Sequence, residues 1–188
     1  TDGNDFLSLP ELGQALNGLP AVIDVLLVDA CSSAMLENAF QVKDYANVLV
    51  GPEGLGYAPG PYDRYLSNLN GDTSMSARTF ATDIVQDYIS WCNGAGDKIQ
   101  NATMSAIDLT KISGLVEAVD DFASNLKEAE TSFHEQIALA RNITQGYIGP
   151  YSEQTGYDID LYDLAQLTQE HVDEGNVRTA AGQVMSAL

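Results

Sequence analysis

A run of almost unbroken aliphatic residues, Val22 to Val28, constrains the fold of this chain more than any other feature. Asp24 is its single charged residue, so the run lacks the alternation of a half-exposed strand and predicts a strand covered on both faces. Apolar side chains at helical spacing follow from Ser33 to Lys43, and Val48 to Val50 is a second short aliphatic run. Strand, helix and strand in this order predict a crossover unit with two parallel strands in an α/β domain.

The rest of the chain alternates between helical and extended patterns without an internal repeat. A loop rich in Gly, Pro and Tyr, Gly51 to Leu66, follows the second strand, at the sheet edge where α/β domains place their ligand sites. Ser8 and Glu11 have the spacing of a capping box and predict a helix that ends at Gly18. Further predicted elements are a helix over 77–92, a strand over 102–109, helices over 110–126 and 128–142, and a helix over 158–171.

Charge limits the partners of the chain. Its 27 acidic and 8 basic side chains give a formal charge of -19, so we expect no nucleic-acid partner and an attraction for cationic peptides. No apolar run approaches the roughly 20 residues of a membrane span, so no transmembrane segment is predicted. The acidity and two glycosylation-type triplets, Asn101-Ala102-Thr103 and Asn142-Ile143-Thr144, favour secretion or the cell envelope.

Cys31 stands at the end of the first aliphatic run, in Asp29-Ala30-Cys31, where a strand is predicted to pass into a helix. A turn at such a junction lifts a side chain above the sheet, and the N-terminus of the helix favours a negative sulfur. Free backbone N–H groups there can also bind a developing oxyanion. Cys31 is therefore a candidate nucleophile, and the alternative is a small apolar core residue, the ordinary role of a buried cysteine.

The residues around Cys31 resemble the clostripain family of cysteine peptidases, part of the larger caspase-like group. The resemblance lies in Asp29-Ala30-Cys31, Met35-Leu36-Glu37, Asp44-Tyr45-Ala46 and Glu53, followed in family order by Pro61-Tyr62-Asp63 and two helical segments. It implies a caspase-like (caspase-haemoglobinase) α/β sandwich, with a mostly parallel central sheet flanked by helices and with helical C-terminal segments. It also implies a hydrolase that cleaves peptide bonds through a Cys31 thiolate.

The resemblance assigns further roles by position. Cys31 matches the nucleophile, and Asp29 matches an acidic residue that shapes the pocket for P1, the substrate residue before the cleaved bond. Family members typically cut after Arg or Lys, whose cation pairs with a carboxylate in that pocket. The family's second pocket acid, in a Gly-Asp-Gly-Trp-like segment, is missing from GYAPGPYD here. Glu53 and Asp63 are the candidates to replace it, and a less acidic pocket is the alternative to an Arg/Lys preference.

The histidine that the family uses as a base lies in a His-Gly motif upstream of the cysteine strand, and the sequence holds no such motif. Family members are often cleaved by themselves into a light and a heavy chain that stay associated. We therefore expect a separate light-chain segment to supply the histidine, with Thr1 near the start of a heavy chain. Residues 1–127 would form the heavy-chain part of the catalytic domain, and residues 128–188 an incomplete helical extension.

Two other interpretations stay open. In a cysteine hydrolase of another fold, His134 or His171 would have to reach Cys31 from a polar helical stretch. The two serines after Cys31 and the missing pocket acid also fit a catalytically inactive binding or structural domain. The chemistry requires no cofactor and no metal site is predicted, although the opening TDGNDF resembles part of a calcium loop and leaves a calcium role open.

Overall fold

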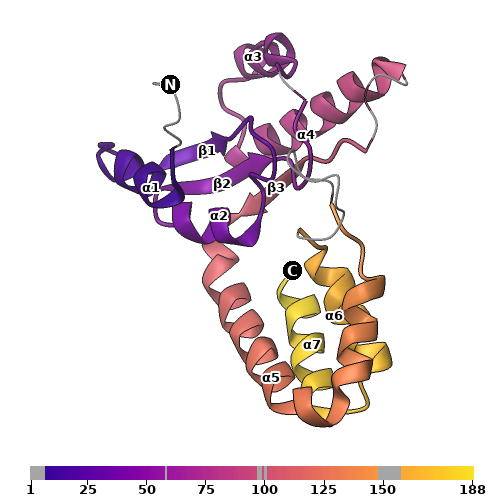
Figure 1. Cartoon of the computed structure of the whole chain (residues 1–188). Coiled ribbons are helices and arrows are strands. Elements are labelled where there is room, and N and C mark those ends of the chain that lie inside the picture. The colour runs from indigo at the N-terminus through magenta and orange to yellow at the C-terminus, as the bar shows by residue number, and fades with distance from the viewer. Residues whose placement is uncertain (1–6, 58, 97–98, 100, 148–157) are drawn as a thin grey trace. The chain divides into compact units, whose positions relative to one another are not determined.

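The computed structural model describes residues 7–57, 59–96, 99, 101–147 and 158–188. The chain forms two compact units, Thr1–Ile112 and Ser113–Leu188. The first unit carries the sheet and Cys31, and the second is helical (Figure 1). The predicted boundary between residues 127 and 128 separates a catalytic part from a C-terminal extension. It does not refer to compact units, so it stays a prediction.

The first unit is built on a three-stranded sheet in the order β1-β2-β3. β1 (Ile23–Leu27) and β2 (Ala46–Gly51) run parallel, with Val25 opposite Val48, as the strand-helix-strand pattern predicts. β3 (Ser105–Asp108) pairs with β2 in the antiparallel sense. The predicted α/β class is confirmed, with a sheet that is mixed because β3 runs in the opposite direction.

One face of the sheet packs on α4 (Ala77–Gly94), which begins where the sequence predicts. Ser76 caps this helix, because its Oγ accepts a hydrogen bond from the Thr79 N–H at 3.1 Å. Successive side chains of a strand point to opposite faces, so only alternate residues of β1 and β2 meet α4. The resulting core contains Val25, Leu27, Val48 and Val50 from the strands and Ala81, Ile84, Tyr88 and Cys92 from α4.

α2 (Leu36–Val42) contacts β2 and the short 3₁₀ helix η2 (Leu109–Lys111). Leu49 alternates with the two valines that face α4, so it points to the opposite side of the sheet, where it is buried. Ala39 and Val42 are the buried residues of α2. Together they form the second, smaller layer of the core.

α1 (Leu9–Asn17) packs on α2 and is capped as the sequence predicts. The backbone N–H and the hydroxyl of Ser8 both donate to the Glu11 carboxylate, at 2.8 and 2.6 Å. Gly18 ends the helix, also as predicted. The sequence predicts both ends of α1 correctly, because each cap depends on residues within one helical turn.

The predicted loop from Gly51 to Leu66 is too long. α3 (Tyr62–Gly71) begins directly after Pro61, whose ring favours the first turn of a helix, and it packs on α4. Tyr65 is its buried residue, whereas Leu66 is exposed, so α3 is a surface helix held by few side chains. Figure 1 shows α3 next to α4 in the first unit.

The second unit consists of α5 (Ile112–Ile143), α6 (Leu161–His171) and α7 (Gly175–Ala187). The predicted break between residues 126 and 128 is wrong, because the non-helical backbone lies at Phe133 (φ -126°, ψ 21°). α6 and α7 pack on each other through small buried residues, including Ala165. Among the described residues, no helix combines the length and the apolar character that crossing a membrane requires.

Candidate active site

The chain makes a tight turn between the end of β1 and the start of α2, and Cys31 lies on it. The Ser33 hydroxyl donates to the Val28 carbonyl at 2.8 Å, which closes the turn on the strand it leaves. Ser32 adopts the left-handed region with φ 53°, which is uncommon for a residue with a side chain. Its N–H donates to the Gly54 carbonyl at 2.8 Å, and its carbonyl accepts from the Asn38 side chain at 2.8 Å. Both backbone groups of Ser32 are therefore used to fix the residue that follows Cys31.

The sulfur of Cys31 is half-buried against the loop after β2. The Gly56 N–H donates to Cys31 Sγ at 3.4 Å, and the thiol lies 3.9 Å from the Gly56 carbonyl oxygen. A Cβ on Gly56 would stand 3.0 Å from Pro52 Cγ and 3.4 Å from the Cys31 nitrogen, so glycine permits this approach. The sulfur is therefore in contact with both backbone groups of Gly56.

One part of the prediction for Cys31 is wrong. The sequence predicts a helix from Ser33, directly after the cysteine, whose N-terminus would face the sulfur. α2 begins only at Leu36, because residues 31–34 are spent on the turn that ties back to Val28 and to the loop after β2. The N–H group at the sulfur comes from Gly56 instead.

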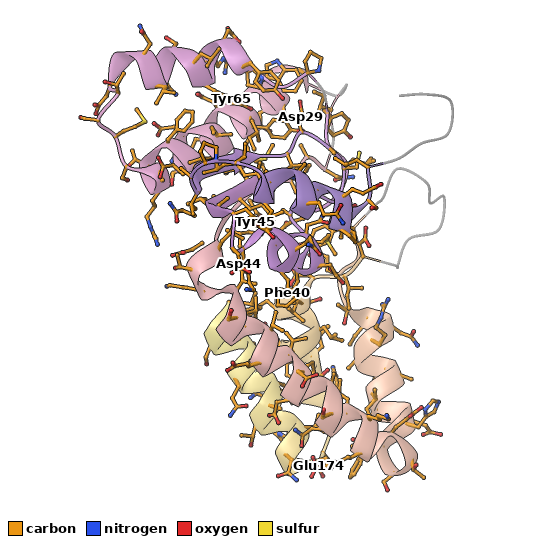
Figure 2. All side chains as sticks on the ribbon, turned by 90° about the vertical axis from the view of Figure 1, so that its left-hand side faces the viewer. Asp29, Phe40, Asp44, Tyr45, Tyr65 and Glu174 are labelled. Carbon is orange, nitrogen blue, oxygen red and sulfur yellow. The ribbon has the colours of Figure 1, made fainter. Side chains whose placement is uncertain are left out.

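Asp29 lies on the same turn, two residues before Cys31, and its carboxylate is held by a tyrosine. The Tyr62 hydroxyl donates to Asp29 Oδ2 at 2.7 Å, which joins the end of β1 to the start of α3. Tyr62 is 40% exposed, so one side of this pair faces solvent. Asp29 and Tyr65 lie at the same end of the first unit in Figure 2.

Two further tyrosines, Tyr65 and Tyr88, lie near enough to Asp29 to feel its charge. The ring of Tyr62 meets the buried ring of Tyr65 edge-on, with centroids 5.6 Å apart, and the Tyr88 hydroxyl accepts a hydrogen bond from the Tyr57 N–H at 2.8 Å. Burial, followed by the hydrogen bond to Asp29 and its charge, raises the pKa of Tyr62 to about 12. Burial and then the Asp29 charge also raise the pKa of Tyr65.

Glu53 is placed away from this carboxylate by its own contacts. Its N–H and that of Gly54 both donate to the Thr103 hydroxyl at 3.0 Å, and its carboxylate accepts from the Ser105 hydroxyl at 2.8 Å. These bonds explain why β3 starts only at Ser105, after the predicted position, since Thr103 is used to hold the loop. In the structure Glu53 anchors the loop that carries Gly56.

Asp63 lies on the exposed first turn of α3, and the hydrogen bond to Asp29 comes from the residue before it, Tyr62. Asp29 and Cys31 thus share one turn, and Tyr62, which the prediction did not single out, is the residue that contacts Asp29. The signal was the concentration of tyrosine in GYAPGPYDRYL, a segment that the sequence equally allowed to be an ordinary loop.

Both histidines lie in the second unit. His134 follows the break in α5, His171 is the last residue of α6, and both are exposed. Within the part of the chain that the structure describes, no group of three or more His, Cys, Asp or Glu side chains is arranged to hold a metal ion. The residues that resemble a calcium loop, Asp2, Asn4 and Asp5, lie outside the described residues.

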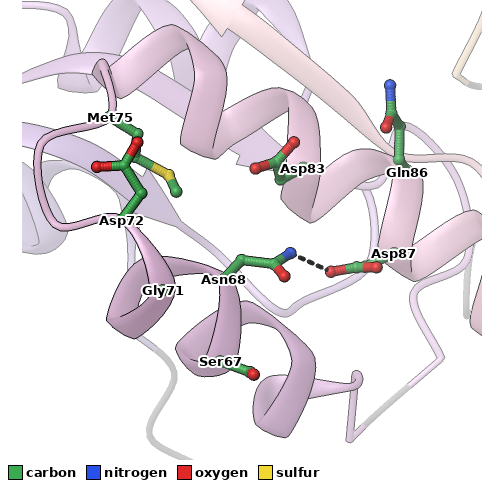
Figure 3. Close-up of a pocket in the computed structure, with 8 residues that line it drawn as sticks. All are labelled: Ser67, Asn68, Gly71, Asp72, Met75, Asp83, Gln86 and Asp87. Atoms are coloured by element: carbon green, nitrogen blue, oxygen red, sulfur yellow. Dashed lines mark hydrogen bonds between the residues drawn. The ribbon is translucent and has the colours of Figure 1, made fainter.

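A hollow of about 400 Å³ lies between α3 and α4 (Figure 3). Asp72, Asp83 and Asp87 line it, and Asp87 accepts a hydrogen bond from the Asn68 side chain at 2.8 Å. None of the residues that the sequence marks as a site lines this hollow. Its acidic lining matches the charge of the whole chain.

The architecture defines the class of the protein. A small mixed sheet flanked by helices, with a cysteine and an acid on the turn after a parallel strand, is the fold of caspase-like cysteine proteases. The chain belongs to the clostripain family, whose sequence profile matches residues 1–186. No curated protein matches it.

Solved structures agree with this assignment. The chain is similar to a cysteine protease of B. fragilis (17% identity, TM-score 0.63), covering 97% of this chain and 72% of that one. It is also similar to a clostripain from Bacteroides thetaiotaomicron in complex with a peptide inhibitor (16% identity, TM-score 0.63, 97% and 74% covered). A secreted C11 cysteine protease from the same organism gives 19% identity and a TM-score of 0.63, with 97% of this chain and 47% of that chain covered. At such identities the likeness establishes the fold.

Proposed function

We propose that this chain carries the nucleophile of a cysteine endopeptidase of the clostripain type. The observation that carries the proposal is the half-buried sulfur of Cys31 with the Gly56 N–H donating to it at 3.4 Å, on a turn that also holds Asp29. A core cysteine is buried among apolar side chains, as Cys92 is at 3% exposure. Cys31 is instead only half-buried, so solvent can reach its side chain, and a nucleophile needs this access.

The proposed reaction proceeds through an acyl-enzyme. A histidine takes the proton from Cys31, the thiolate attacks the scissile carbonyl carbon, and the carbonyl oxygen becomes an oxyanion stabilised by backbone N–H groups. The histidine then protonates the leaving amine as the C–N bond breaks. Water, deprotonated by the same histidine, attacks the thioester and releases the acid and the thiol.

The histidine is proposed to come from a light-chain segment that associates with this chain. The open side of the sheet supports this, since in the described residues β1 pairs only with β2. The exposed side of a strand carries backbone groups that another strand can satisfy. A segment added beside β1 would place its residues next to the turn that follows this strand.

The proposed substrate is a peptide or protein with a basic P1 residue. Asp29 supports this choice, because it stands two residues before Cys31 in the sequence and carries a carboxylate. Its partner Tyr62 is a neutral hydrogen-bond donor, so a cationic P1 side chain would add a positive charge that this contact does not supply. Secretion is proposed from the similarity to a secreted protease of the same fold. Self-cleavage into chains is proposed from the family and rests on the same cysteine.

The test compares the two thiols of the chain in the full precursor, using fluorogenic peptides with Lys or Arg at P1. Cys31→Ala should abolish both peptide hydrolysis and separation into chains. Cys92→Ala removes the buried thiol and should retain both activities, which makes it the matched control. Hydrolysis by the Cys31→Ala protein at the rate of the wild type would refute the proposal.

A catalytically inactive binding domain is the alternative. Two of the candidate acids of the P1 pocket already accept a hydrogen bond within the chain, Asp29 from Tyr62 and Glu53 from Ser105. This is consistent with a domain that does not hydrolyse peptides. Such a domain would bind a basic peptide without cleaving it. Binding that is lost in Asp29→Asn, together with no hydrolysis by the full precursor, would favour this function.

A further inference from the structure

Tyr62 contacts the Asp29 carboxylate from the first turn of α3. Each oxygen of a carboxylate has two lone pairs, and Tyr62 uses one of those on Oδ2 with a hydrogen bond of 2.7 Å. Tyr62 is itself held in place, because it is the first residue of α3, directly after the buried Pro61, and its ring packs on Tyr65. The hydroxyl therefore orients Asp29 from a fixed position.

The negative charge of Asp29 is not neutralised by this contact. In the described parts of the chain, the ion pairs of lysine and arginine join Lys43 to Asp44, Arg78 to Asp108 and Arg178 to Asp173, and none includes Asp29. The raised pKa of Tyr62 is consistent with a neutral phenol donating to an ionised acid. One oxygen of Asp29 is thus engaged while the full charge is available to a ligand.

We propose that Tyr62 is a specificity-determining residue, which makes the Asp29 pocket select Lys over Arg at P1. This inference rests on the proposed peptidase function and adds the choice between the two basic residues. Arg binds a carboxylate best as a planar fork, with two parallel hydrogen bonds to both oxygens. Lys is a compact charge with freely rotating donors and needs only Oδ1. The Tyr62 hydroxyl takes one of the two lone pairs of Oδ2 and stands beside it, so a second donor can approach that oxygen from one direction only. This hinders the fork, which needs both oxygens in one plane, more than it hinders the ammonium.

The experiment measures kcat/KM of the full precursor on three peptides that differ only at P1, with Lys, Arg or the uncharged norleucine. Tyr62→Phe keeps the ring and its packing on Tyr65 but removes the hydroxyl, so the fold should be retained, as a thermal melt will show. We expect the wild type to prefer Lys. In Tyr62→Phe the Arg-to-Lys ratio should rise about tenfold or more, the effect of one hydrogen bond to a charged group.

A matched control is Tyr162→Phe, which removes a phenol that is 50% exposed in the second unit and should leave the ratio unchanged. Asp29→Asn should lower kcat/KM for Lys and Arg peptides to the level of the norleucine peptide. An unchanged Arg-to-Lys ratio in an active Tyr62→Phe protein would overturn the role of Tyr62 alone. Failure of the wild type to cleave any of the three peptides would overturn the proposed function as well.

Discussion

A single methyl group added at Gly51 should disturb the turn that carries Cys31. It ends β2, and a Cβ placed there would clash with Ser33 Oγ and stand 3.2 Å from Ser33 Cβ and 3.3 Å from the Val28 carbonyl oxygen. Ser33 is buried and its hydroxyl is bonded to that same carbonyl, so it has little freedom to move. Overpacking of this kind costs about 1–3 kcal/mol, and losing the hydrogen bond about 1 kcal/mol more. Gly51→Ala should therefore destabilise the first unit by about 2–4 kcal/mol.

Urea unfolding followed by tryptophan fluorescence measures this change, because Trp91, the single tryptophan of the chain, lies in α4 of the same unit. Gly71→Ala is the matched control, since a Cβ there would meet nothing within 4 Å, and its stability should stay within about 0.5 kcal/mol of the wild type. Ser33→Ala removes the atom that clashes, so the double variant with Gly51→Ala should lose less stability than the two single variants added. Strict additivity, or a Gly51→Ala protein as stable as the control, would refute this account of the turn.

Three further outcomes are expected. Thr103→Val leaves two loop N–H groups without their acceptor and should destabilise the first unit by about 1–3 kcal/mol in the same urea assay, and an unchanged midpoint would contradict this. In a tyrosinate absorbance titration, Asp29→Asn should lower the pKa of Tyr62 from about 12 towards its ordinary value of about 10, because the charge that opposes a phenolate is removed; a Tyr62 that already ionises near 10 in the wild type would contradict it. Iodoacetamide should modify Cys31 in the folded protein, whereas Cys92, whose pKa is raised by burial, should react only after unfolding, as peptide mass mapping will show; equal rates would argue against the difference in environment.

The elements that the sequence predicts well are those fixed within a few residues of chain. The capping box at Ser8 and the start of α4 after Ser76 depend on contacts within one helical turn. β1 and β2 form within the aliphatic runs that predict them. The predicted burial on both faces is wrong for β1, because each of its residues is at least partly exposed. The resemblance to the clostripain family adds the position of Cys31.

The features that the sequence does not predict depend on contacts between distant residues. The turn after Cys31 delays α2 because Ser32 bonds to Gly54, which lies 22 positions further along the chain and is itself tied to Thr103. The partner of Asp29 is Tyr62, 33 positions away, and hydrophobic periodicity carries no information on such a pair. The break in α5 falls at Phe133, where neither glycine nor proline marks it.

Among the described residues β1 is paired on one side only, and this has a consequence for the polypeptide at high concentration when no further segment is bound there. A free strand flank is a template for a second copy of itself, and the same geometry underlies the early steps of fibrous aggregation. The charge of -19 opposes that encounter by mutual repulsion. Acidification protonates the carboxylates and concentrated salt screens them, so both conditions should bring the copies together and turn a clear solution cloudy.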